Sequence, residues 1–200
     1  MSIRLCSLVV IVATVVALGC ESRVQQPAGP SALQTAAPTA LAATPSHQSA
    51  DREQQHVIGL FDACDPETFN AALGPGTCVR SGGIVFNKFL ELLRRNGSVG
   101  PWHFAPTTTT MRVGQLLVAD NRGGETHTFT EVEDFGGGIV PILNQLTGLT
   151  TVAPECQQLA QGDFLAPGAS SSEEEEEVGI EKYQCCIHPW MRAEIRITEK

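Results

Sequence analysis

The spacing of apolar residues changes twice along the chain. Residues 5–18 are almost continuously apolar, which is typical of the core of an export signal. In residues 84–95 the apolar side chains recur at helical spacing and stop at an Asn-Gly pair, which predicts a short amphipathic helix. From residue 102 onward the period becomes two, in short runs separated by Gly and Pro. This pattern predicts an all-β sandwich that follows a short helical extension.

Individual elements can be placed on this pattern. Asp65-Pro66-Glu67 predicts the start of a helix, because an N-cap is followed by Pro in the first turn. A strand ending at the turn that begins with Arg122 precedes the alternating segment that contains His127. The cleanest alternation is Ala193-Glu194-Ile195-Arg196-Ile197, which we expect to close the sheet. Strands are predicted over 102–106, 111–113, 115–121, 126–130, 163–168, 179–185 and 193–197.

The N-terminal region predicts export. Arg4 precedes the apolar run, so residues 1–19 are predicted to be a signal peptide. The sequence Ala17-Leu18-Gly19-Cys20 resembles a bacterial lipoprotein processing site, in which Cys20 would be acylated. Ordinary signal cleavage nearby, leaving Cys20 as a spare thiol, is the alternative. We therefore expect a protein on the periplasmic or cell-surface side, tethered to the membrane by a lipid.

Composition divides the remainder of the chain. Residues 20–50 are rich in Ala, Pro, Ser, Thr and Gln, and they cannot bury enough apolar surface to offset their ordering entropy. This stretch predicts a disordered tether. We expect a small helical, disulfide-pinned extension over 51–97 and one β-sandwich domain over 98–200.

The charge of the chain restricts its partners. The formal net charge is −9, and loss of the single positive charge of Arg4 with the signal makes it −10. An acidic surface argues against nucleic acid and favours a basic partner. The acidic run 173–177 is expected to be a solvated loop.

The cysteine count points to an unpaired thiol. Of seven cysteines, Cys6 leaves with the signal and Cys20 is the lipidation candidate. An odd number remains, so one has a role other than pairing. If Cys185 binds a metal, four are left for two disulfides in an oxidising compartment. Cys64 with Cys78, across a Gly-Pro-Gly loop, and Cys156 with Cys186 are the hypotheses, since spacing alone does not fix connectivity.

Soft metal donors are concentrated near the C-terminus. The sequence Cys185-Cys186-Ile187-His188-Pro189-Trp190-Met191 has the form C-x-x-H-P-W-M, and His127 lies far upstream in an alternating strand. Two imidazoles, one thiolate and a weak axial thioether are the ligands of blue-copper sites. We expect His127, Cys185, His188 and Met191 to bind one copper ion that cycles between Cu(I) and Cu(II).

Other interpretations of these residues have to be weighed. Zinc is a weaker alternative, because structural zinc sites rarely take Met. A disulfide between Cys185 and Cys186 would abolish the site, but such strained bridges are uncommon. Strand parity and the C-x-x-H spacing favour Cys185 as the ligand, with Cys186 on the opposite side. The other histidines, His47, His56 and His103, are not predicted to be ligands.

Residues 100–200, which contain these donors, resemble a cupredoxin. The metal loop is similar to that of amicyanin and plastocyanin, and a strand with Gly114-Gln115, then Asn121 and a turn, precedes the first His. The resemblance implies a cupredoxin-like Greek-key β-sandwich with His127, Cys185 and His188 equatorial and Met191 axial. It further implies that the edge of His188 is exposed to redox partners in an apolar docking patch with Pro189 and Trp190.

The sequence also departs from this family. Thr128 follows the first His where Asn or Ser is usual, although a hydroxyl can still bond across to the Cys loop. The stretch between His127 and Cys185 is longer than in short-chain members. We therefore expect an inserted lobe at 136–172, closed by the bridge between Cys156 and Cys186.

The function that follows from these features is one-electron transfer. A membrane-tethered copper protein would exchange electrons with redox proteins of the periplasm or respiratory chain and would transform no substrate itself. Storage, delivery or sensing of copper is the first alternative, and a recognition or subunit role in a larger oxidase is the second. Multicopper catalysis is not expected, because the chain lacks the His-x-His pairs of a trinuclear cluster.

Overall fold

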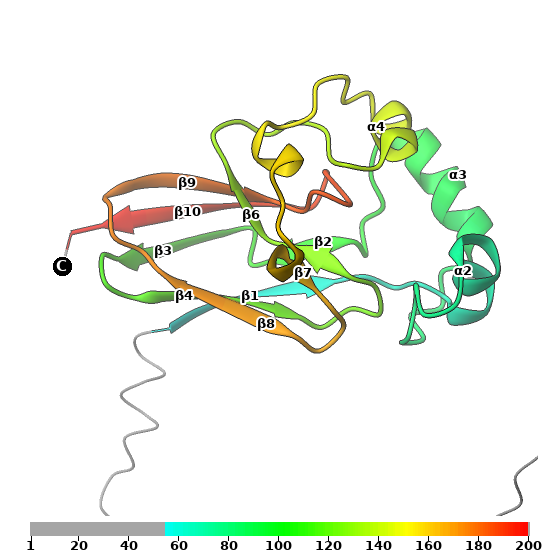
Figure 1. Cartoon of the computed structure of the whole chain (residues 1–200), viewed down its shortest axis with the longest axis horizontal. Helices are drawn as coiled ribbons and strands as arrows, with labels where there is room; N and C mark the ends of the chain where they lie inside the picture. The colour runs from blue at the N-terminus through cyan, green and yellow to red at the C-terminus, as the bar shows by residue number, and fades with distance from the viewer. Residues whose placement is uncertain (1–54, 200) are drawn as a thin grey trace, which may run out of the picture. The chain divides into compact units, whose positions relative to one another are not determined.

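The computed structural model describes residues 55–199, which form a β-sandwich with helices at one end (Figure 1). The predicted signal, the tether, Cys20 and His47 lie outside the described residues. Within the described part, no helix is long and apolar enough to cross a membrane. The elements are β1 (Gln55–Phe61), α2 (Pro66–Leu73), α3 (Phe86–Asn96), β2 (His103–Ala105), β3 (Thr108–Arg112), β4 (Leu116–Asn121), β5 (His127–Thr128), β6 (Thr130–Val132), α4 (Pro141–Thr147), η1 (Glu155–Gln157), η2 (Gln161–Asp163), β7 (Phe164–Leu165), β8 (Ser170–Glu174), β9 (Gly179–Gln184) and β10 (Arg192–Thr198).

Two four-stranded sheets make the two layers of the sandwich. The first has the order β2-β1-β4-β8 and the second the order β3-β10-β9-β6, while β5 and β7 form a two-stranded ribbon. The pairs β1–β4 and β10–β3 are parallel, and the other pairs within the two sheets are antiparallel. The predicted β-sandwich is confirmed.

Alternation along the strands explains the core. In β10 the side chains of Ala193, Ile195 and Ile197 are buried, whereas those between them are more exposed. In β4, Leu117 and Ala119 face the same interior. Burial of a side chain the size of Ile or Leu stabilises a fold by about 1.5–3 kcal/mol. One-sided burial therefore holds the two sheets face to face.

The predicted domain boundary needs a correction at its N-terminal side. The extension was placed at 51–97, but β1 lies inside the first sheet, paired with β2 on one side and β4 on the other. This strand has consecutive buried residues, including Ile58 and Leu60, rather than a clean alternation. Such a pattern is typical of a central strand, which carries no period-two signal. The helical part begins only after β1.

The helical extension is pinned as predicted. Cys64 and Cys78 form a disulfide with a Cα–Cα distance of 6.1 Å. The carboxylate of Asp65 caps α2 by accepting the N–H of Thr68 at 2.9 Å, as expected for an N-cap aspartate. The buried Phe89 of α3 packs its ring against Trp102 at 4.8 Å between ring centroids. The helices therefore continue the core of the sandwich.

The segment between β6 and β8 forms the predicted lobe. It contains α4 and the two short 3-10 helices η1 and η2, and the Cys156–Cys186 disulfide joins it to the predicted metal loop, with a Cα–Cα distance of 5.4 Å. The acidic run 173–177 was expected to be a solvated loop, which is wrong for its first part. Glu173 and Glu174 end the edge strand β8, which pairs with β4, and Glu175 is buried.

Candidate metal centre

The loop between β9 and β10 is held tightly by its own backbone. The N–H of Cys185 donates to the carbonyl of Met191 at 3.0 Å, and the N–H of Met191 donates to the carbonyl of His188 at 2.9 Å. The loop thus closes on itself as it leaves β9 and enters β10. All three side chains are buried, so the predicted ligands of this loop lie in the interior.

His127 reaches the same place from β5, which pairs with β7 opposite Leu165. Its Nδ1 lies 3.8 Å from the Sγ of Cys185, and the Nδ1 of His188 lies 3.9 Å from the same sulfur. The three donor atoms lie within 4.8 Å of one another and are buried. One thiolate and two imidazoles at this spacing fit a copper ion, because soft sulfur and imidazole nitrogen are ligands that copper prefers.

Met191 belongs to the same buried region. Its side chain is fully buried in the main core, together with Cys185. Its main chain is bonded to both ends of the C-x-x-H segment. The fourth predicted ligand is therefore carried by the loop that holds the thiolate and His188.

The sulfur of Cys185 is surrounded by donors that favour its ionised form. The backbone N–H groups of Thr128 and His188 each point to Sγ at 3.4 Å. Burial alone would raise the pKa of this thiol, but the contacts with His127 and His188 outweigh burial and bring the pKa well below its ordinary value. A thiolate is the form that binds metal.

Thr128 connects the His127 strand to the Cys loop. Its hydroxyl accepts the N–H of Cys186 at 2.7 Å, as expected from the sequence. Cys186 points away from the donor cluster and pairs with Cys156 in a separate small core. Cys185 is the free cysteine among the described residues, so the alternative of a Cys185–Cys186 disulfide is ruled out for this structure.

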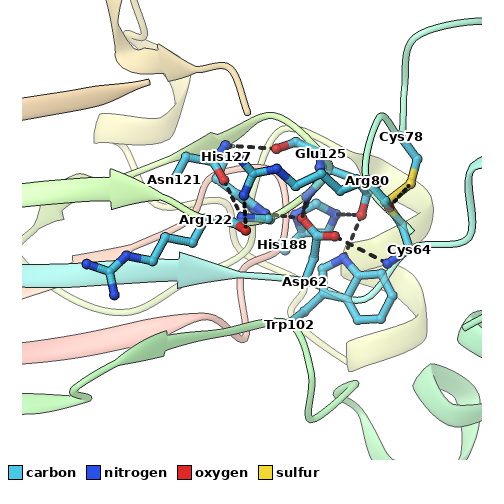
Figure 2. Close-up of polar contacts among 12 residues, drawn as sticks. Asp62, Cys64, Cys78, Arg80, Trp102, Asn121, Arg122, Glu125, His127 and His188 are labelled. Atoms are coloured by element: carbon cyan, nitrogen blue, oxygen red, sulfur yellow. Dashed lines mark hydrogen bonds and ion pairs between the residues drawn. A yellow bond between two sulfur atoms is a disulfide. The ribbon is translucent and has the colours of Figure 1, made fainter. Parts of the chain in front are cut away.

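A buried carboxylate that sequence analysis missed contacts His127. Asp62 follows β1, its side chain is 1% exposed, and its Oδ2 lies 3.0 Å from His127 Nε2 (Figure 2). The same oxygen accepts the N–H groups of Gly124 at 2.7 Å and Glu125 at 2.9 Å. Burial alone would raise the pKa of Asp62, but the hydrogen bonds from His127 and from the backbone outweigh it and lower the pKa.

In the metal-free protein, the environment of His127 favours protonation. Burial opposes the positive charge, yet the hydrogen bonds to Asp62 and Cys185 prevail and raise the pKa of His127 to about 9. A proton on the metal-facing nitrogen competes with a metal ion. Metal binding therefore has to displace this proton from the site.

A second buried carboxylate faces His188. Glu125 accepts the indole N–H of Trp102 at 2.6 Å, and its Oε2 lies 3.8 Å from His188 Nε2. Burial raises the pKa of Glu125, while the opposite charge of His188 and the bond from Trp102 pull the pKa down in part. Asn121 fixes this turn by donating to the carbonyl of Glu125 at 2.8 Å (Figure 2).

The exposed His edge that the resemblance implies is not observed. His188 is only 4% exposed and Pro189 is buried, while Trp190 is half-buried against Phe89 and His188. An apolar pocket of about 410 Å³ leads to the histidine instead. Its walls come mainly from α2, α3 and α4, and its lining includes Phe69, Phe86, Phe89, Val140, Leu143, Glu125 and His188.

Of the other histidines, His56 and His103 lie within residues 55–199, and neither belongs to the donor cluster. His103 is exposed and stacks on Phe61, and His56 Nε2 is paired with the side chain of Gln115 at 3.2 Å. Asp62, Cys64 and Glu125 also lie close enough to suggest a metal group. The sulfur of Cys64 is bound in a disulfide, which removes that group as a thiolate site.

Comparison with known proteins adds similarity of structure only. No protein-family model matches the chain, and no curated protein matches it. Similar solved structures include a purple cupredoxin from Nitrosopumilus maritimus (21% identity, TM-score 0.37, 50% of this chain and 86% of that chain). A copper(I) amicyanin mutant is also similar, with 18% identity, a TM-score of 0.33 and coverage of 48% of this chain and 73% of that chain. The oxidised plastocyanin of Dryopteris crassirhizoma has 17% identity, a TM-score of 0.34 and coverage of 50% of this chain and 93% of that chain. With every one of these TM-scores below 0.5, they carry no argument about function.

Proposed function

We propose that this protein is a copper protein of the type-1 kind that carries one electron at the cell envelope. The observation that carries the proposal is the meeting of His127, Cys185 and His188 donors within 4.8 Å in a buried site. Met191, on the same loop, would provide a fourth, weak thioether ligand. Copper bound there would supply a Cu(I)/Cu(II) couple, and the chain itself would transform no substrate.

The surrounding protein is suited to electron transfer because it restrains the ligands. The loop is closed by its own backbone bonds, and the Cys156–Cys186 bridge ties it to the lobe. His127 is held from β5 and by Asp62. Ligands that cannot move apart on oxidation or reduction keep the reorganisation of the site small. A donor set held by two strands and a short closed loop meets this requirement.

The proposed partners are redox proteins of the periplasm or respiratory chain. A partner would approach His188 through the apolar pocket over it rather than at a free histidine edge. Of the predicted docking residues Pro189 and Trp190, the second packs against His188 and Phe89. The acidic charge of the chain favours a basic partner and argues against nucleic acid. Lipidation of Cys20 would keep the protein at the membrane.

The burial of His188 supports a second candidate function. A protein that stores, delivers or senses copper gains from a closed site, whereas an electron carrier gains from a short path to the surface. The helices α2 and α3 lie over the His188 side of the site and leave it 4% exposed. The two candidates therefore differ in the rate of electron exchange that they predict.

Loading the purified mature protein with Cu(II) tests the proposal. The carrier requires intense blue absorption from the thiolate and a reversible potential. Cys185→Ala should remove the colour, and Met191→Leu should keep the copper and shift the potential. A colourless protein that binds only Cu(I) would rule out the carrier. A blue protein that exchanges electrons very slowly with small redox mediators would favour storage or delivery.

A further inference from the structure

We propose that Asp62 positions His127 at the copper site and that Asp62 and Glu125 together favour the Cu(II) state. The inference rests on the proposed copper function and deepens it. Each imidazole of the site has a buried carboxylate near its Nε2 (Figure 2). The Nδ1 of each imidazole faces the sulfur of Cys185. Neither carboxylate belongs to the predicted ligand set.

The contacts of Asp62 define its charge and its direction. Its Oδ2 meets three donors, namely two backbone N–H groups and His127 Nε2, and its Oδ1 accepts the N–H of Cys64 at 3.2 Å. A carboxylate surrounded by donors only is stabilised as the anion. The side chain lies beside the Cys64–Cys78 disulfide, which fixes the chain on its C-terminal side. Asp62 is thus a fixed acceptor aimed at His127.

This acceptor determines which nitrogen of His127 is left for the metal. An acceptor at Nε2 requires a hydrogen on Nε2, so the lone pair of the neutral ring lies on Nδ1. Nδ1 is the nitrogen that lies 3.8 Å from the Sγ of Cys185. A ligand histidine held by a carboxylate in this way is more basic and cannot rotate freely.

Glu125 provides the corresponding group for His188. Its carboxylate is anchored by the indole N–H of Trp102 and faces Nε2 at 3.8 Å, while Nδ1 faces the thiolate at 3.9 Å. The placement is similar to that of Asp62 beside His127, but at 3.8 Å the contact acts through charge and not through a hydrogen bond. Both carboxylates are almost fully buried, at 1% and 6% side-chain exposure, so water screens their charges weakly.

A fixed negative charge at Asp62 changes the balance between the oxidation states of a copper ion held by His127, and the carboxylate of Glu125 adds to this effect in its ionised form. Cu(II) carries one more positive charge than Cu(I), so a buried anion stabilises Cu(II) more strongly. Removing one of these charges should therefore raise the fraction of Cu(I) at a given ambient potential. Mutation of such partners of ligand residues changes metal affinity by about 10–100-fold.

The test uses Asp62→Asn and Glu125→Gln in the full copper-loaded protein. In Asp62→Asn the amide oxygen can still accept the two backbone N–H groups and His127, so the size and these three bonds are kept. The negative charge is lost, together with the bond from the N–H of Cys64, which would face the amide NH2. We expect the Cu(I)/Cu(II) ratio at fixed potential to rise about tenfold, which is about 59 mV for one electron. Blue absorption should persist, and Cu(II) affinity should fall.

Asp120→Asn is the matched control. Asp120 lies at the end of β4, is 33% exposed and pairs with the exposed Arg122, so the same charge is removed where water screens it. We expect less than a twofold change in the ratio. An Asp62→Asn shift no larger than the control, or in the opposite direction, overturns the proposal. If Asp62→Asn does not fold, Glu125→Gln decides by the same criterion.

A readout without electron transfer separates this inference from the proposed function. In protein loaded with Zn(II), nitrogen NMR should show His127 bound through Nδ1, with a slowly exchanging proton on Nε2. Binding through Nε2 would overturn the role of Asp62. A wild-type protein that is colourless with copper but shows this tautomer would contradict the electron-carrier function and leave the positioning role intact.

Discussion

The Cys156–Cys186 disulfide joins the metal loop to the lobe, and the stability that it adds can be calculated from the separation of its cysteines in the sequence. Replacing Cys156 and Cys186 together by Ala removes a link between residues 30 apart in sequence. In the chain-entropy model, a loop of this length stabilises the folded state by about 3.6 kcal/mol at 25 °C. The free energy of unfolding of a typical domain is about 5–15 kcal/mol, so this loss is a large part of it. The variant should therefore be folded but markedly less stable.

The copper donors should survive this change. The backbone bonds of Cys186 to Thr128 and to Ile139, at 2.7 Å each, do not depend on the sulfur. Urea unfolding of the metal-free protein, followed by tryptophan fluorescence, measures the free energy directly. Cys64→Ala with Cys78→Ala is the companion variant, for which the separation of 14 residues gives about 3.0 kcal/mol.

A loss of less than about 1 kcal/mol for the Cys156 and Cys186 pair would refute the reasoning, since the entropy model requires several times more. It would mean that the lobe is held by its other contacts, such as the backbone bonds of Gly137 with Thr151 and Ala153. A loss of copper binding in a variant that remains folded would refute the prediction that the copper donors survive removal of the disulfide. The bridge would then have to position Cys185 itself.

Three further predictions concern charge, capping and the aromatic cover. Burial and the neighbouring Glu181 and Glu173 raise the pKa of Glu175 to about 8, so the folded protein binds this proton more tightly than the unfolded chain does. Unfolding free energy should therefore fall as pH rises from the ordinary carboxyl pKa towards 8. Glu175→Gln should flatten thermal stability between pH 5 and pH 8, and an unchanged slope would contradict this. Asp65→Ala should cost about 1 kcal/mol through the lost N-cap of α2, whereas Asp65→Asn should cost much less; equal losses in thermal unfolding would argue against the cap. Phe89→Ala should cost about 3–5 kcal/mol and speed removal of Cu(I) by a bulky chelator, with Phe89→Leu intermediate; an unchanged removal rate would show that this ring does not close the site.

Features with local signals were predicted well. The period-two pattern gave β10 and β4, and the capping sequence at Asp65 gave the start of α2. The donors of the loop follow from their spacing, because seven residues that close one turn bring Cys185 and His188 together. The odd cysteine count indicated one unpaired thiol, and the structure confirms both proposed disulfides.

Features that depend on contacts distant in sequence were missed. Asp62 meets His127 across 65 positions, and an acidic residue after a strand ordinarily indicates a solvated turn. β1 was not recognised as a strand of the sandwich, because a strand buried between two neighbours shows no alternation. The helices that cover His188 were predicted, but their position over it was not. The periodicity of an amphipathic helix shows which of its faces is apolar, and it does not show which part of the protein that face packs against.

The absorption spectrum of the mature protein loaded with one equivalent of Cu(II) tests the central claim most directly. A thiolate from Cys185 beside His127 and His188 predicts an intense visible charge-transfer band, which should be absent in Cys185→Ala. Addition of one electron per copper should remove the band, because it reduces Cu(II) to colourless Cu(I). A spectrum with only weak visible absorption, or an intense band that survives in Cys185→Ala, would contradict the account.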